Sequence, residues 1–223
     1  MSSPTAQNPG FAHATLGNFT RDLAARRSVP GGGAAAGSAL AHAAALGSMV
    51  VAFSRGKKTF QAHESLLEEA QELLETTRTE ALRLADADAA GFEVLASLWP
   101  LAEDDPVRLE GWASAVMGAI EPPRDLVTLA HRTGTLLLRL VGRSSRMLRS
   151  DLAIAAKFAG LAADAAAWNV RMNLDAFRDL PERAQEAAEL ESTVNRCLRE
   201  SDEITRRIDR ACLEDRRTPI TEG

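Results

Sequence analysis

The stretch Val29-Pro30-Gly31-Gly32-Gly33-Ala34-Ala35-Ala36-Gly37-Ser38 runs directly into an apolar segment that ends near Phe53. Proline followed by three glycines gives a rigid entry and then a backbone that is free to adopt positive φ values. From 34 to 53 nearly every residue is Ala, Gly, Ser, Leu, Val or Met, so a helix here is apolar on all sides and must be buried. We therefore predict a buried Ala/Gly-rich central helix around which the other segments pack.

The other segments repeat apolar residues at helical spacing, and no stretch alternates like a β-strand. Pro122-Pro123 is expected to end one helix and to open the next. The fold class predicted is all-α, a helical bundle with no β-sheet, forming a single domain over residues 1–223 with loose ends at 1–9 and 215–223. The expected helices besides the central one are 11–27, 60–98, 109–120, 126–146, 152–177 and 182–214.

Composition narrows the class of protein. A length of 223 residues suits one domain with a sizeable core, and 45% hydrophobic with 26% charged residues is ordinary for a soluble protein. The net charge of −5 argues against a general nucleic-acid binder. The run from 34 to 53 is long enough to raise the question of a membrane span, but it is rich in Gly, Ala and Ser and carries His42. We interpret it as a core helix, and His42 as a hydrogen-bonded core histidine rather than a catalytic base.

The two cysteines, Cys197 and Cys212, fall in the last expected helix. On one straight helix they would lie roughly 22 Å apart, which is too far for a disulfide. No cluster of His and Cys has metal-ligand spacing, so no metal site is expected. A reduced, cytoplasmic setting fits this pattern.

Both ends of the central helix have two interpretations. At Gly31, Gly32 and Gly33, free N–H groups at a helix start would bind an anion or ligand, or the glycines would simply permit close packing. At the other end, Lys57 and Lys58 would pair with a substrate carboxylate or supply an acid/base group, or they would be solvated cations that complement the helix dipole.

Three polar groups further along the chain also carry alternatives. Asp86 and Asp88 are two residues apart and do not share a helix face, so at most one points into a site, and Asp88 is favoured over a surface Asp86. Asp151 would cap a helix start or belong to a site. Asn169 and Asn173 are four residues apart on one face, where their amides would hydrogen-bond to a ligand or to a neighbouring helix.

Four blocks in order along the chain resemble the formiminotetrahydrofolate cyclodeaminase / methenyltetrahydrofolate cyclohydrolase family. The first is Pro30-Gly31-Gly32-Gly33 with its Ala-rich helix, and the second is Ser54-Arg55-Gly56-Lys57-Lys58-Thr59-Phe60. The third is Asp86-Ala87-Asp88-Ala89-Ala90-Gly91-Phe92. The fourth is Ser150-Asp151-Leu152 followed by Trp168-Asn169-Val170-Arg171-Met172-Asn173-Leu174 and Asp179.

The resemblance implies a one-carbon folate enzyme, either a cyclodeaminase (a lyase) or a cyclohydrolase (a hydrolase). It implies a tetrahydrofolate derivative as substrate, with or without a polyglutamate tail, no prosthetic group, and general acid/base catalysis without a metal. It also implies a homodimer with sites between subunits, and Lys58, Asp88 and Asp151 as catalytic residues. The substrate-binding residues it implies are Gly31, Gly32, Gly33, Lys57, Arg143, Arg146, Arg149, Asn169 and Asn173.

The chain departs from the family pattern at several positions. Ala34 stands where the family has serine, and Gly91 stands for an alanine. The segment Gly142–Arg149 replaces a Gly/Asn-rich turn and adds Arg143, Arg146 and Arg149. These arginines would take a glutamate tail by charge-assisted contacts, or they mark a changed substrate. The alternative is therefore a non-catalytic folate-binding or dimeric helical scaffold, and which folate reaction runs stays open.

Overall fold

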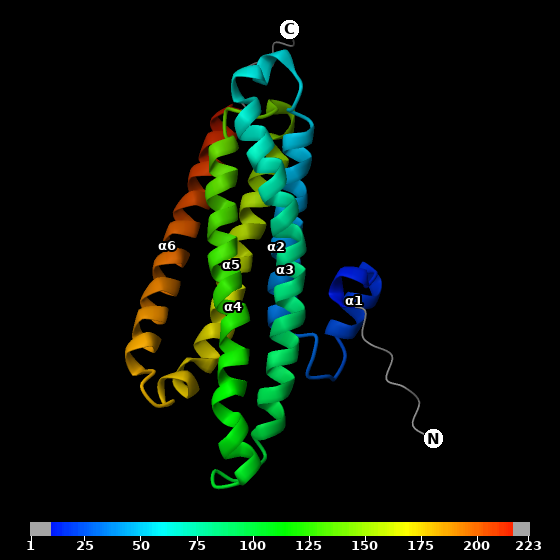
Figure 1. Ribbon diagram of the computed structural model, residues 1–223. Helices are drawn as coiled ribbons and strands as arrows, with labels where there is room; N and C mark the ends of the chain where they lie inside the picture. The colour runs from blue at the N-terminus through cyan, green and yellow to red at the C-terminus, as the bar shows by residue number, and fades with distance from the viewer. Residues whose placement is uncertain (1–9, 216–223) are drawn as a thin grey trace.

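The computed structural model describes residues 10–215, and within that range every regular element is a helix and no strand is found (Figure 1). The all-α prediction is confirmed. The loose ends expected at 1–9 and 215–223 fall outside the described residues, except that Asp215 is the last residue of a helix. The elements are η1 (Phe11–His13), α1 (Leu16–Leu23), α2 (Gly32–Ala52), η2 (Lys58–His63), α3 (Glu64–Leu98), α4 (Pro106–Leu140), η3 (Arg146–Leu148), α5 (Arg149–Arg178) and α6 (Ala184–Asp215).

The Ala/Gly-rich helix α2 is the centre of the bundle, packed against α3 and α5 and touching α4. Leu40, Ala43 and Val50 have no exposed surface. Small residues are required because the helices approach closely: a Cβ at Gly37 would lie 2.6 Å from the carbonyl oxygen of Ala81 on α3. Within the described range α2 is also the one helix long and apolar enough to cross a membrane, and 61% of its most apolar window is buried in the bundle.

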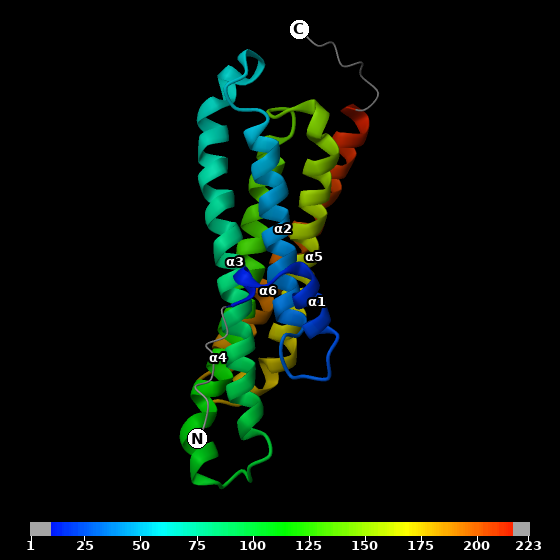
Figure 2. The same ribbon diagram turned by 90° about the vertical axis from the view of Figure 1, so that its right-hand side faces the viewer.

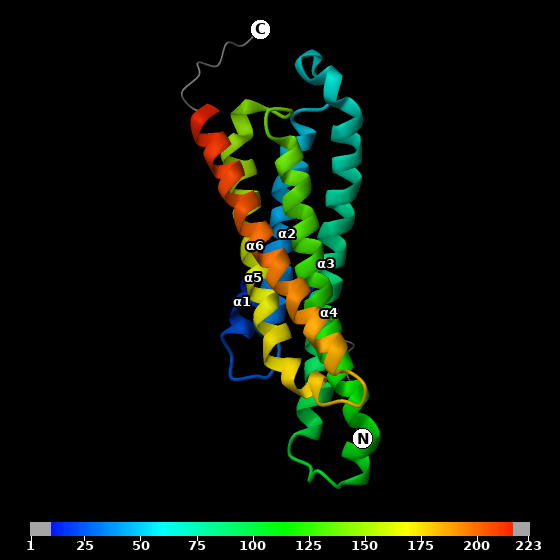
Figure 3. The same cartoon turned by 90° about the vertical axis from the view of Figure 1, so that its left-hand side faces the viewer.

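The five long helices run alternately up and down the bundle, as Figures 1 and 2 show. α6 lies against α4 and α5 on the side away from α1 (Figure 3). The hairpin of α3 and α4 extends beyond the other helices at the end where α2 begins (Figure 2). Its two arms meet at Gly91, where a Cβ would lie 2.2 Å from the carbonyl oxygen of Gly118. The glycine that departs from the family pattern is therefore the residue that lets α3 and α4 touch.

The prediction that Pro122-Pro123 separates two helices is wrong, because α4 is continuous from Pro106 to Leu140 with both prolines buried inside it. Proline removes the backbone donor to the carbonyl four residues earlier. The carbonyl freed by Pro123 is that of Ala119, and it accepts a hydrogen bond of 3.1 Å from Asn173 Nδ2 on α5. A side chain of a neighbouring helix thus replaces the missing donor, and packing keeps the helix intact.

Three other predicted boundaries are also corrected. Residues 11–27 form η1 and a separate α1, whose N-cap Thr15 accepts a hydrogen bond from the Asn18 amide. α4 ends at Leu140 rather than at residue 146, which leaves a turn before α5. The last helix begins at Ala184 rather than at residue 182, because Glu182 has a φ of 62° that no helix accommodates.

Candidate active site

The glycine start of α2 lies directly against Asp88 of α3. Gly31 is the extended N-cap residue of α2, Gly32 and Gly33 form its first turn, and no side chain caps it. A Cβ built on Gly33 would lie 1.9 Å from Asp88 Oδ2 and 2.3 Å from its Cγ, a distance at which no atom fits. Glycine at position 33 is therefore what makes room for this carboxyl group, and the structure brings these predicted site residues together.

Burial raises the pKa of Asp88 to about 6. Within residues 10–215 no hydrogen bond or ion pair satisfies its carboxyl group, yet the side chain is only half-buried, so a ligand can reach it. A carboxyl group of this kind holds or releases a proton close to neutral pH. Asp88 is therefore suited to proton transfer.

Asn169 and Asn173 of α5 have different surroundings. Asn173 Nδ2 donates to the carbonyls of Ala119 and Asn169, so its amide holds the bundle together. Asn169 lies beside the glycine start, with its Oδ1 3.6 Å from a Cβ built on Gly32. Its Nδ2 is buried and has no hydrogen-bond partner. A buried donor without a partner, beside the glycine start of α2, is a place where a polar ligand could be held.

Lys57 and Lys58 lie beyond the opposite end of α2, as the N-cap and the first residue of η2, and both are exposed. α2 has 21 residues, so its two ends are about 31 Å apart at 1.5 Å per residue. Within one chain the structure therefore does not bring Lys58 near Asp88. It does join the turn after α2 to the segment between α4 and α5, because the Ser145 amide donates a 2.8 Å hydrogen bond to the buried Ser54 Oγ.

The three arginines gather at this same basic end. Arg143 is exposed and donates to the Arg139 carbonyl, while Arg146 and Arg149 are half-buried. Together with nearby residues of η2 and α6, these last two arginines line a pocket of about 460 Å³. Its walls are Thr59, Phe60, His63, Val141, Gly142, Ser144, Ser145, Arg146, Arg149, Leu152, Ala211 and Cys212.

Asp151 also lies at the basic end, half-buried in the first turn of α5. The first interpretation of Asp151, a cap at the helix start, is wrong, because the helix begins at Arg149 with Leu148 as N-cap. The short η3 turn feeds directly into the helix and places Asp151 inside it. Asp151 thus lies by the arginines, far from Asp88.

Two residues have surroundings that differ from those expected. His42 is exposed rather than in the core: its Nδ1 lies 2.7 Å from the Ser38 carbonyl and its ring stacks on Phe158 of α5 at 5.7 Å. Asp86, expected on the surface, is half-buried and its Oδ1 accepts a 3.0 Å hydrogen bond from the Phe11 amide. No local signal marked the second contact, because its partners are 75 residues apart.

An apolar surface crosses α2 and α5 and was not recognised in the sequence. None of the residues that form this surface is buried. On each helix they recur at alternating spacings of four and three, the pattern of a helix-packing seam. Trp168 and Met172, 62% and 74% exposed, close one end of it next to Asn169. This α2–α5 seam consists of Ala35, Ala39, His42, Leu46, Met49 and Phe53 with Ile154, Phe158, Leu161, Ala165, Trp168 and Met172.

The fold and the site define a class of protein: an all-helical bundle whose glycine helix start faces a carboxyl group with a raised pKa and an amide nitrogen without a hydrogen-bond partner. No group of three His, Cys, Asp or Glu side chains in residues 10–215 is placed to hold a metal ion. No strand precedes the glycines over residues 10–30, so the site is unlike a dinucleotide fold or a P-loop.

Residues 15–192 match the model of the formiminotransferase-cyclodeaminase family, and the chain belongs to that family. Formimidoyltransferase-cyclodeaminases of Gallus gallus and Sus scrofa are each 28% identical over 177 residues, 78% of this chain. The match covers 33% of each relative, so the chain spans about one third of their length. A crystal structure of formiminotetrahydrofolate cyclodeaminase from Thermotoga maritima shares the fold, with a TM-score of 0.80, 24% identity, and coverage of 91% of this chain and 98% of that one.

Proposed function

We propose that the protein acts on tetrahydrofolate derivatives, as a formiminotetrahydrofolate cyclodeaminase or a methenyltetrahydrofolate cyclohydrolase, by general acid/base catalysis. The observation that carries the proposal is Asp88, an unpaired carboxyl group with a pKa of about 6 against the glycine start of α2. The names of the relatives and of the structural neighbour support the choice of folate substrate.

Both reactions pass through a tetrahedral carbon between two folate nitrogens. In the first, N10 adds to the formimino carbon of 5-formiminotetrahydrofolate and loses its proton, and the imino nitrogen, which gains two protons in turn, leaves as ammonia. In the second, water adds to the carbon of 5,10-methenyltetrahydrofolate and loses both of its protons as the formyl C=O forms, and the bond to N5 breaks as N5 gains one proton. Each needs one group that exchanges a proton near neutral pH, and no bond to the protein forms. Asp88 supplies that group.

The pterin would lie at the glycine start. The backbone N–H groups of Gly31–Gly33, at the positive end of the α2 dipole, would point toward the oxygen of the pterin. Asn169 Nδ2, which has no partner in the protein, would donate to an acceptor on the pterin ring. Asn173, whose amide is used by the bundle, acts by holding Asn169 in place. Cys197 and Cys212 are not joined in a disulfide, which is consistent with a reduced cytoplasmic setting, and we propose no prosthetic group, nucleic acid or membrane as a partner.

We propose that a second copy of the chain completes the site. The α2–α5 seam is apolar and exposed, and it leads to Asn169 and the glycine start. A twofold axis perpendicular to α2, through the middle of the seam, would turn the partner's helix end for end. The Lys58 end of one copy then meets the Asp88 end of the other. Lys57, Arg143, Arg146 and Arg149 would hold the glutamate tail there, and Lys58 and Asp151 would face the reacting atoms.

The test offers 5-formimino- and 5,10-methenyltetrahydrofolate separately to purified protein, following the methenyl absorbance. We expect turnover of one of them, rising through an apparent pKa near 6 if Asp88 acts as a base, and a loss of about 100-fold or more in Asp88→Asn. Unchanged decay with folate-dependent thermal stabilisation would instead favour the non-catalytic folate binder. Ala34, buried where a serine hydroxyl is expected, motivates that second candidate. If the protein shows no turnover and no folate-dependent stabilisation, folate is excluded as its ligand.

A further inference from the structure

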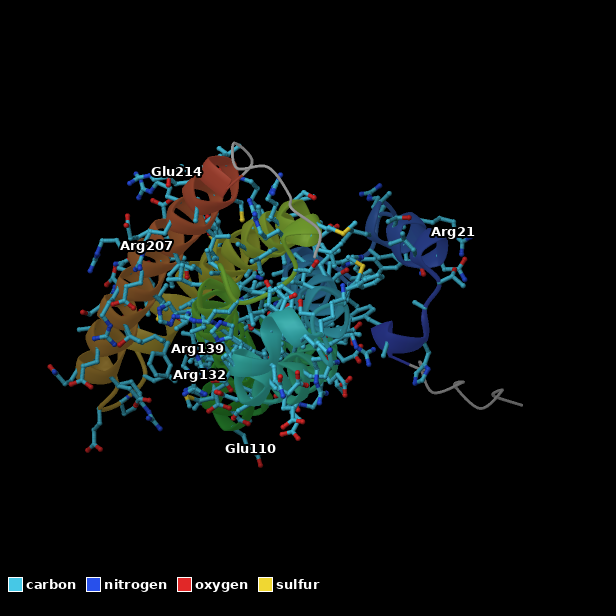
Figure 4. The ribbon with its side chains drawn as sticks, turned by 90° about the horizontal axis from the view of Figure 1, so that it is seen from above. Arg21, Glu110, Arg132, Arg139, Arg207 and Glu214 are labelled. Atoms are coloured by element: carbon cyan, nitrogen blue, oxygen red, sulfur yellow. The ribbon has the colours of Figure 1, made fainter. Side chains whose placement is uncertain are left out.

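The N-terminal arm, residues 10–30, contains a helix, α1, that has no buried residue. Figure 4 shows α1, with Arg21, standing apart from the packed helices. The apolar residues of α1, Leu16, Phe19 and Leu23, nevertheless share one face. An eight-residue helix with no buried face gains little packing energy to hold its position. Contacts at the two ends of the arm must therefore determine where it lies.

The first end is held by Asp86. Phe11 is the first residue of η1, and its backbone N–H donates a 3.0 Å hydrogen bond to Asp86 Oδ1. Gly10 stands next to it with a φ of 78°, and a Cβ there would lie 2.8 Å from Asp86 Oδ2. Both the backbone conformation and the space at Gly10 are thus fitted to this carboxylate.

The second end leads into the candidate active site. Val29 and Pro30 precede Gly31, the N-cap of α2. They line the same hollow as Asp86, a space of about 1160 Å³ between the arm and α3. Asp86 is also two residues from Asp88 on α3. The arm is therefore fixed at both ends to the two elements that carry Gly33 and Asp88, and it stands away from the bundle between them.

We propose that Asp86 is a positioning residue, which fixes the N-terminal arm at the entrance to the Asp88 site and so sets how tightly substrate is held. It accepts the Phe11 amide and does not touch the reacting atoms. The expected effect of Asp86 on substrate binding rests on the proposed function, whereas its effect on the position of the arm does not depend on any substrate. The carboxyl groups of Asp86 and Asp88, two residues apart on α3, thus have separate tasks.

Asp86→Ala removes the acceptor, and Asp86→Asn keeps an oxygen that accepts the same hydrogen bond. With Asp86→Ala we expect tryptic cleavage at Arg21, Arg26 and Arg27 to accelerate about tenfold, since local opening exposes the arm. We expect KM for the folate substrate to rise about fivefold or more with kcat within about twofold, because binding and not chemistry is weakened. Asp86→Asn should restore both values to within about twofold of the unmodified protein.

Glu93→Gln is the matched control, because Glu93 lines the same hollow on α3 without holding the arm. It should leave cleavage and KM unchanged, whereas Gly10→Ala should repeat the effect of Asp86→Ala. The proposal is overturned if Asp86→Ala leaves cleavage unchanged, if Asp86→Asn behaves like Asp86→Ala, or if kcat falls with KM unchanged. If the unmodified protein turns over no folate, the proposed function fails, while the tryptic assay still decides whether Asp86 holds the arm.

Discussion

The carboxyl group of Asp88 occupies the space that a side chain at Gly33 would fill, with Oδ2 1.9 Å from the position of that Cβ. The start of α2 and a carboxyl group of α3 are thereby fitted to each other across two helices. The glycine is needed less for its own conformation than for the residue that it faces.

Gly33→Ala should push the Asp88 carboxyl group away from the helix start. We expect kcat/KM to fall by about 100-fold or more, because a displaced acid/base group loses its geometry. Gly32→Ala is the steric control, since its Cβ would meet nothing closer than Asn169 Oδ1 at 3.6 Å. A crystal structure or the pH–rate profile would report the displacement of the Asp88 carboxyl group. Equal activity in the two alanine variants would contradict a close fit between Asp88 and Gly33.

Asp88→Asn should change how stability depends on pH. Because burial raises the folded pKa from 3.8 to about 6, the native state binds more protons than the unfolded state between these values. Stability of the natural protein therefore falls as pH rises through that window, by about 3 kcal/mol, and the asparagine variant lacks this loss. Urea titrations should show the variant more stable at pH 7 and equal below pH about 3.8. Parallel curves would rule out the raised pKa.

Asn169→Leu and Asn173→Leu should separate ligand binding from stability. Asn169 Nδ2 is buried without a partner, so its loss should cost less than about 1 kcal/mol of unfolding free energy while the folate KM rises about tenfold. Asn173 Nδ2 donates a hydrogen bond to the Ala119 carbonyl, so the loss of this amide should cost about 1–2 kcal/mol of unfolding free energy. Denaturation and kinetics on both variants test this, and a large stability loss at Asn169 would show that its amide is structural.

Gly91→Ala and Gly118→Ala should change stability in opposite directions. Alanine favours a helix by about 1 kcal/mol over glycine at either position. At Gly91, however, the new Cβ would lie 2.2 Å from the Gly118 carbonyl oxygen, and such overpacking costs about 3 kcal/mol. A Cβ at Gly118 would come no closer than 3.9 Å to Gly91. Thermal unfolding should therefore show Gly91→Ala destabilised and Gly118→Ala slightly stabilised, and the reverse order would contradict the packing.

The fold could be predicted because composition alone determines much of it. A run of Ala and Gly from 34 to 53 has one stable environment, the interior of a bundle, and α2 lies there. Pro122 and Pro123 misled the prediction because the donor that compensates for Pro123 comes from Asn173, 54 residues from the carbonyl that it serves. Local rules do not reveal a partner on another helix.

The candidate site was predictable only in part, for the same reason. Its glycines and Asp88 could be proposed from their types and spacing, but the fit of Asp88 to Gly33 needs two helices in register. The α2–α5 seam was hidden in α2, because a helix apolar all round shows no preferred face until its neighbours are placed. Lys58 and Asp88 were grouped by resemblance, and the length of α2 separates them within one chain.

Mixing two inactive variants tests most directly whether Asp88 of one copy works with Lys58 of another. Lys58→Ala and Asp88→Asn chains, co-expressed in equal amounts, would form mixed dimers in which one of the two sites is intact. We expect about one quarter of the unmodified activity, since half of the dimers would carry one working site of two. Lys58→Ala mixed with the Lys58→Ala/Asp88→Asn chain has no intact site and is the control. Absence of recovery in the first mixture would contradict a shared site.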